Sequence, residues 1–180
     1  SKTSGRDGFV NILNYDVIWI YGLTSTLDEL SCYCECVYLN ENLSREVKKK
    51  AFVERSNIGW KIASQVTSCK VILSNRPLPS DPSLVVGGCD LSERGIYNVE
   101  RMLSDYIRND KCWLMFQPNR TFVRSPEGNV MTDRIFSEGS LGLAHFGTDH
   151  GSGDRQDFVH MNKIFGDLMW EDFFNLLKNL

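Results

Sequence analysis

Apolar residues change their spacing along this chain, and the order of these changes constrains the fold more than any other feature of the sequence. Residues 15–22 form a short run rich in β-branched and aromatic side chains, which is typical of a strand. From Ser44 onward, by contrast, apolar residues recur at steps of four and seven, as on one side of a helix. Segments of both kinds follow one another to the end of the chain, so the sequence predicts mixed α and β structure.

The predicted elements follow the order β-β-α-β-β-α-β-β-β-α. The predicted strands are residues 15–22, 30–39, 69–74, 84–86, 112–116, 121–124 and 129–132, and the predicted helices are residues 44–66, 90–107 and 154–180. Consecutive strands joined by short polar segments favour hairpins at both ends of the chain. Asp90 and Glu93 have the spacing of a capping box at the start of the middle helix. The sequence therefore predicts an α+β fold, in which a mainly antiparallel sheet carries about three helices packed on one face.

Length and composition fit one globular domain. The 180 residues are enough to bury a single core, so we expect residues 1–180 to form one domain, with residues 1–10 as a flexible N-terminal tail. The apolar runs are far shorter than the roughly 20 residues that cross a bilayer, so we expect no transmembrane segment. Six cysteines are fewer than a small disulfide scaffold carries. We therefore expect reduced thiols and an intracellular protein, cytoplasmic or nuclear.

Three of these cysteines alternate in the stretch Cys32-Tyr-Cys-Glu-Cys36. On a strand, neighbouring same-face residues lie about 7 Å apart. This spacing is too wide for the sulfur ligands of one zinc ion, and disulfides between residues i and i+2 are strained. The pattern therefore predicts a strand face of small buried residues, and a metal or redox role is the alternative.

The net charge of −3 conceals an uneven distribution. Between Arg45 and Arg76 the chain carries eight basic residues and two acidic ones, a balance of +6 that leaves −9 for the remainder. Such a region can attract the phosphates of nucleic acid or of anionic lipid. A solvated helix face is the alternative interpretation. The residues expected to contact anions are Arg45, Lys48, Lys49, Lys50, Arg55 and Lys61.

All three histidines lie within sixteen residues, in a glycine-rich segment that also contains aspartates. Imidazole and carboxylate groups on one loop can converge on a divalent metal ion. The segment lacks the spacing His-Glu-x-x-His, however, and an exposed polar loop is the alternative. The candidate metal ligands are His145, Asp149, His150 and His160. The sequence predicts no catalytic residue and no cofactor.

The C-terminal segment is apolar over more than one side of its predicted helix. A helix at the surface of the domain would leave part of this apolar circumference exposed, and such a remainder is typical of a partner-contact or self-association site. A central core helix that is covered all round is the alternative. The candidate contact residues are Phe165, Met169, Trp170, Phe173, Phe174 and Leu177.

These features favour a non-enzymatic protein-interaction or self-assembly domain with a basic surface. Its partner would be another protein or a second copy of the chain. A small viral structural or accessory protein of the matrix-like type combines self-association with anionic contacts in the same way, and this comparison is an analogy of properties. One alternative is a module that binds nucleic acid, either RNA or single strands. The other is a metal-dependent hydrolase that uses the histidine segment.

Overall fold

A computed structural model of the chain describes residues 11–55, 61, 63, 65–66, 68–81, 90–107, 111–139 and 161–180. The described strands are β1 (Val17–Thr26), β2 (Lys70–Arg76), β3 (Cys112–Leu114), β4 (Phe122–Arg124) and β5 (Val130–Thr132). The α-helices of this part are α1 (Leu27–Tyr33), α2 (Arg45–Arg55), α4 (Glu93–Tyr106) and α5 (Lys163–Leu177). Shorter turns are the π-helical η2 (Cys34–Tyr38) and the 3-10 helices η1 (Ile12–Asn14), η4 (Asn119–Thr121) and η5 (Arg134–Phe136).

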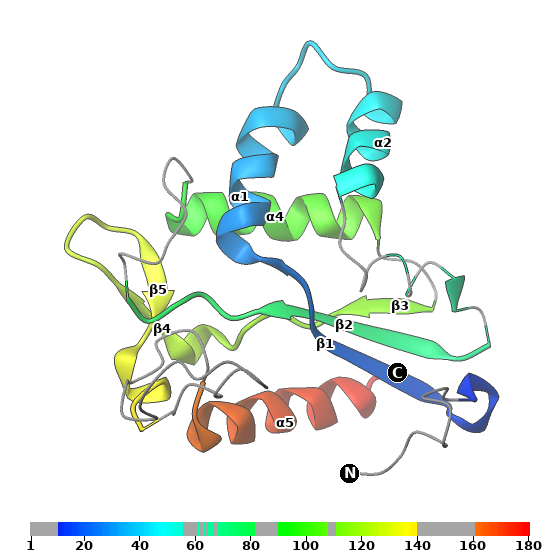
Figure 1. Cartoon of the computed structure of the whole chain (residues 1–180), viewed down its shortest axis with the longest axis vertical. Helices are drawn as coiled ribbons and strands as arrows, with labels where there is room; N and C mark the ends of the chain where they lie inside the picture. Colours follow the sequence, from blue (N-terminus) through cyan, green and yellow to red (C-terminus); the bar gives the residue numbers. More distant parts are fainter. Residues whose placement is uncertain are drawn as a thin grey trace, which may run out of the picture.

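The main sheet is parallel and has helices on both faces. Its described strands follow the order β1-β2-β3, and both pairings are parallel. Figure 1 shows α1, α2 and α4 on one face of this sheet and α5 on the other. The predicted α+β class is confirmed, whereas the mainly antiparallel sheet with about three helices on one face is wrong. The antiparallel part is the separate hairpin of β4 and β5, close to where the sequence predicts one.

The segment of alternating cysteines explains this error. Residues 27–38, most of which the sequence assigns to a strand, form α1 and η2 instead. The Glu29 carboxylate accepts a hydrogen bond from the Thr26 backbone N–H at 3.1 Å, as in a capping box that opens a helix. Because a helix follows β1, the chain crosses over before it enters β2, so the two strands run parallel.

Two apolar cores, one on each face of the sheet, account for the continuous burial of β2. Val71 and Leu73 belong to the larger core, which α1 and α4 complete. Ile72, whose side chain points the opposite way, belongs to the smaller core under α5 with Phe165 and Met169. A strand that is covered on both faces reads as an unbroken apolar run, as is typical of parallel sheets.

The middle helix, α4, forms where the sequence predicts it, but its cap differs. The Ser92 hydroxyl accepts a hydrogen bond from the Gly95 backbone N–H at 3.2 Å, so Ser92 is the N-cap. Asp90 precedes this N-cap, and its carboxylate accepts a hydrogen bond from the Ser92 backbone N–H at 2.9 Å. The predicted capping box of Asp90 and Glu93 is therefore wrong, although the predicted N-cap, Asp90, and the observed N-cap, Ser92, lie within one helical turn of each other.

Candidate functional site: an aromatic surface on α5 and β1

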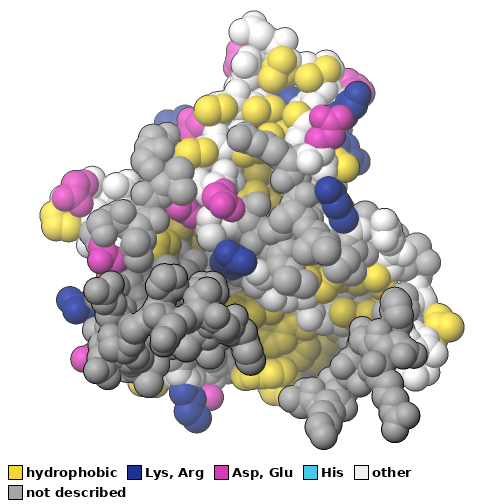
Figure 2. Space-filling view, in the orientation of Figure 1, with side chains coloured by type: hydrophobic (Ala, Val, Ile, Leu, Met, Phe, Trp, Pro, Cys, Tyr) yellow, Lys and Arg dark blue, Asp and Glu magenta, His cyan; other side chains and the backbone are white. Residues whose placement is uncertain are grey.

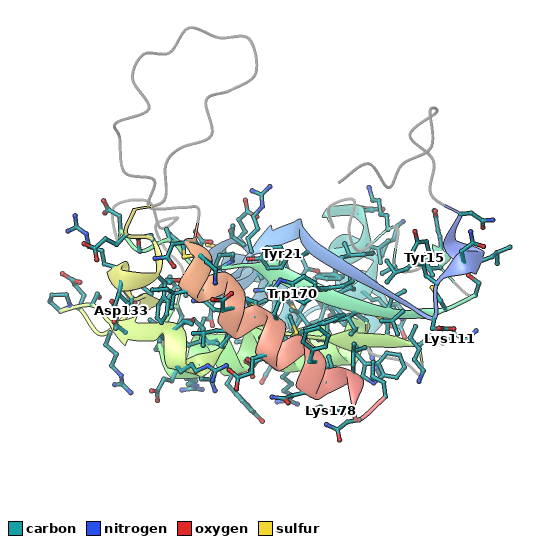
Figure 3. All side chains as sticks on the ribbon, turned by 90° about the horizontal axis from the view of Figure 1, so that it is seen from below. Tyr15, Tyr21, Lys111, Asp133, Trp170 and Lys178 are labelled. Atoms are coloured by element: carbon teal, nitrogen blue, oxygen red, sulfur yellow. The ribbon has the colours of Figure 1, made fainter. Side chains whose placement is uncertain are left out.

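Helix α5 crosses the face of the sheet opposite to α4, as Figures 1 and 3 show. Its start is held by Asn162, whose side-chain oxygen accepts from the Phe165 backbone N–H at 3.2 Å. The Asn162 amide also donates to the Ile135 carbonyl oxygen at 2.7 Å. These bonds tie the first turn of the helix to the chain after β5.

One side of α5 meets β1 in a group of aromatic rings, which we call the aromatic surface: Trp19, Tyr21, Trp170, Phe173 and Phe174. The Trp19 ring stacks on Phe173 with centroids 4.5 Å apart and meets Trp170 edge-on at 5.0 Å. Its indole N–H donates to the Ser74 hydroxyl at 2.8 Å, which holds the ring in one orientation. The aromatic surface is therefore a preformed group of rings.

Three of these rings remain substantially open to solvent. Tyr21 is 43% exposed, Trp170 is 50% exposed and Phe174 is 54% exposed. Figure 3 shows Tyr21 and Trp170 close together in a view onto this face of the sheet. In Figure 2 hydrophobic side chains gather in the lower middle of the molecule, where Figure 1 places α5. Large aromatic side chains that stay exposed side by side are typical of interaction sites.

The charges beside the aromatic surface balance one another. Arg120 pairs with Glu171 at 2.8 Å and with Asp172 at 3.2 Å. Lys163 pairs with Asp167 at 2.6 Å, and Lys178 follows at the end of the helix. This set has three cations and three anions, so it adds no net charge beside the aromatic rings.

The structure separates the six contact residues that the sequence predicts into three groups. Phe165 and Met169 are 2% and 3% exposed and lie in the smaller core. Phe173 and Leu177 are half-buried at the edge of that core. Only Trp170 and Phe174 are exposed. Trp19 and Tyr21 were not among the predicted contact residues, although their i, i+2 spacing in a predicted strand places them on one face.

The predicted basic residues of α2 lie on the side of the sheet opposite to α5 (Figure 1). Arg45, Lys49 and Lys50 are exposed on α2, and Lys50 approaches Glu54 at 3.9 Å. Lys48 is half-buried, because its ammonium group donates to the Tyr38 carbonyl oxygen at 2.8 Å. Lys61 is exposed, and the side chain of Arg55 lies outside the described residues.

Two helices bring three of the cations together in a way that the sequence does not reveal. Arg101 of α4 joins Arg45 and Lys48 around a cleft of about 440 Å³. Tyr38 lines the same cleft and donates to the Asp105 carboxylate at 2.6 Å. Burial, and then this hydrogen bond, raises the pKa of Tyr38 to about 12, so its hydroxyl remains a neutral donor. The cleft is thus polar, with positive side chains outnumbering the carboxylates of Glu41 and Asp105.

The predicted metal ligands His145, Asp149, His150 and His160 lie outside the described residues. Within the described ranges, no group of three or more His, Cys, Asp and Glu side chains is arranged to hold a metal ion. The histidine segment therefore stays a prediction from sequence alone.

The cysteines do not form the predicted strand face. Cys32 is disulfide-bonded, in contrast to the expectation of reduced thiols, whereas Cys34, Cys36, Cys69 and Cys112 are free. Burial, with a smaller contribution from Glu35, raises the pKa of Cys34 to about 12. Burial also raises the pKa of Cys112 to about 11. These two thiols are therefore protonated at neutral pH and are poor nucleophiles.

No protein-family model, no curated protein and no solved structure matches this chain. Each helix in the described part of the chain is too short or too polar to span a bilayer. What the protein does has to be inferred from its own residues, and among those described the aromatic surface has the clearest geometry.

Proposed function

We propose that this chain is a protein-interaction domain that self-associates through the aromatic surface. The observation that carries this proposal is the joint exposure of Tyr21, Trp170 and Phe174 in one preformed group of rings. Aromatic side chains bury about 150–250 Å² each and supply much of the binding energy of protein interfaces. The rings are already ordered, so association costs little additional side-chain entropy.

A second copy of the chain is the partner that the surrounding charges favour. A two-fold interface brings the same patch of both subunits together, so a patch of one sign would repel its copy. The balanced set formed by Arg120, Lys163 and Lys178 with Asp167, Glu171 and Asp172 avoids this repulsion. The same balanced set gives a polyanion or an acidic membrane no net electrostatic attraction.

The test is the light-scattering mass over a series of protein concentrations at low and high salt. We expect a concentration-dependent dimer that persists at high salt, because apolar burial is screened far less than charge attraction. Replacing Trp170 by glutamate should give a monomer with an unchanged circular dichroism spectrum, since the ring is 50% exposed in the single chain.

Tyr97→Glu provides the matched control, because Tyr97 is an aromatic residue of α4 that is 62% exposed on the other side of the sheet. This variant should dimerise like the wild type. A wild-type protein that stays monomeric at every concentration would contradict the proposal. So would a Trp170→Glu variant that associates as strongly as the Tyr97→Glu variant.

A second candidate function is polyanion binding at the α2–α4 cleft. The observation that favours it is the convergence of Arg45 and Arg101, neither of which forms an ion pair within the described part of the chain. Guanidinium groups bind phosphates through paired hydrogen bonds. Single-stranded RNA is the polyanion to test, since its flexible backbone can enter such a cleft.

Changing Arg45 and Arg101 together to glutamine should weaken binding of a single-stranded RNA oligonucleotide and lower its salt dependence. Loss of two phosphate contacts is expected to reduce the slope of log affinity against log salt by about 1.4. Fluorescence anisotropy at several salt concentrations measures both quantities. Lys163→Gln with Lys178→Gln removes the same charge from α5 and serves as the control. Equal effects of the two double variants would assign the binding to net charge and eliminate the cleft.

A further inference from the structure

A cavity of about 570 Å³ lies at the ends of β1 and β2, away from the cleft on α2 and α4. The described lining includes Tyr21 and Gly22 of β1, Arg76 at the end of β2, Pro77 and Pro79 just after it, and the first turn of α5. Both strands run in the same direction, so this is the carboxyl-terminal edge of the parallel sheet. Proteins with parallel sheets bind small ligands at this edge, in cavities of about 300–1,000 Å³.

One side chain of the lining offers an oriented positive charge. The Arg76 Nε–H donates to the Gly22 carbonyl oxygen at 3.0 Å, which holds the plane of the guanidinium group. No carboxylate within the described residues forms an ion pair with Arg76. Its two terminal nitrogens are therefore available to two oxygens of one carboxylate or phosphate.

One wall of the cavity is apolar. Phe165 is 2% exposed and forms a wall with Pro77 and Pro79. Asp28 also lines the cavity, at 3% exposure, whereas Arg76 is exposed. A ligand that carries both a negative group and an apolar part is thereby oriented, because the negative group is attracted to Arg76 and the apolar part packs against Phe165 and the prolines.

We propose that this cavity is a binding site for a small organic anion. Its compact apolar or aromatic part packs against Phe165 and the prolines, and its carboxylate or phosphate group binds the Arg76 guanidinium. An inorganic anion can bind Arg76 but has no apolar part to pack against Phe165 and the prolines. A neutral aromatic compound can pack there but has no charge to bind Arg76. We therefore expect each of them to bind more weakly than an aromatic anion.

Gly166 of α5 allows a direct test of this assignment. It lines the cavity, and a Cβ atom added at this position meets no other atom within 4 Å. A leucine side chain can therefore extend into the cavity without displacing the fold, and leucine is a better helix former than glycine. Gly166→Ala makes the same backbone change but leaves most of the cavity open, so it is the matched control.

Isothermal titration calorimetry with phenylacetate and phenyl phosphate tests the site, with benzyl alcohol and inorganic phosphate as partial probes. We expect saturable binding of at least one aromatic anion, and whichever one binds distinguishes a carboxylate from a phosphate site. Gly166→Leu should weaken that binding about tenfold or more, whereas Gly166→Ala should leave it unchanged. Arg76→Met should reduce the affinity of the aromatic anion to that of benzyl alcohol.

The proposal is overturned if neither aromatic anion binds saturably, or if Gly166→Leu binds the probes as the wild type does. It is also overturned if inorganic phosphate binds as tightly as phenyl phosphate, because the apolar wall then contributes nothing. Should Gly166→Leu fail to fold, Arg76→Met still decides the question. Trp170→Glu is expected to retain probe binding, so failure of the proposed self-association and failure of this site give different results.

Discussion

Replacing Phe165 by alanine is expected to lower the free energy of unfolding by about 3–5 kcal/mol. Phe165 is 2% exposed and packs in the smaller core with Ile72, Met115 and Met169. Its ring also meets Phe136 with centroids 6.2 Å apart, which connects α5 to the chain after β5. Truncation removes the apolar contacts and leaves a cavity between the helix and the sheet that neighbouring side chains can fill only in part.

Phe174→Ala is the matched comparison, because it removes the same side chain from the same helix. Phe174 is 54% exposed, so we expect it to cost less than about 1 kcal/mol of stability. It should nevertheless weaken self-association, since its ring stacks on Trp170 at 5.7 Å within the aromatic surface. Urea unfolding and light-scattering mass, measured on both variants, separate the two effects. Equal losses of stability would show that α5 does not present these two faces as described.

Replacing Gln117 by methionine is expected to destabilise the fold by about 2–4 kcal/mol. Gln117 is 3% exposed, and its side-chain oxygen accepts from the Leu78 backbone N–H at 2.9 Å. Its amide nitrogen donates to the hydroxyls of Thr121 at 2.9 Å and Thr132 at 2.7 Å. One buried side chain thus joins the segment after β2 to the hairpin of β4 and β5.

The reason for the expected loss is the Leu78 N–H, which would stay buried without an acceptor. The two threonine hydroxyls lose less, because each still donates to a backbone carbonyl oxygen, Thr121 to Pro118 and Thr132 to Leu78. Gln65→Met is the control, since Gln65 is exposed and its replacement should change stability by less than about 0.5 kcal/mol. Chemical denaturation of both variants is the measurement, and similar midpoints would refute the role of the network.

Several elements could be predicted because their determinants lie within a few residues. The apolar spacing of α2 and α4, the run of β2 and the turn between β4 and β5 are local patterns, and each element forms close to its predicted position. The cysteine segment could have been assigned too. Leu27, Leu30, Cys34 and Val37 have helical spacing, but the alternation of the cysteines suggested a strand, and the capping role of Thr26 and Glu29 was missed.

The sequence by itself determined where most helices and strands form, that the chain mixes α and β structure, and that basic residues are concentrated between Arg45 and Arg76. Only the tertiary structure decided the direction of the strands, because that depends on the path of the connections between them. It also decided which side of α5 is covered. Phe165 and Phe174 lie in one apolar helix, and only packing against the sheet buries the first and exposes the second. Likewise, Arg101 and Arg45 line one cleft, and Arg76 and Phe165 line one cavity, only because distant segments fold against each other.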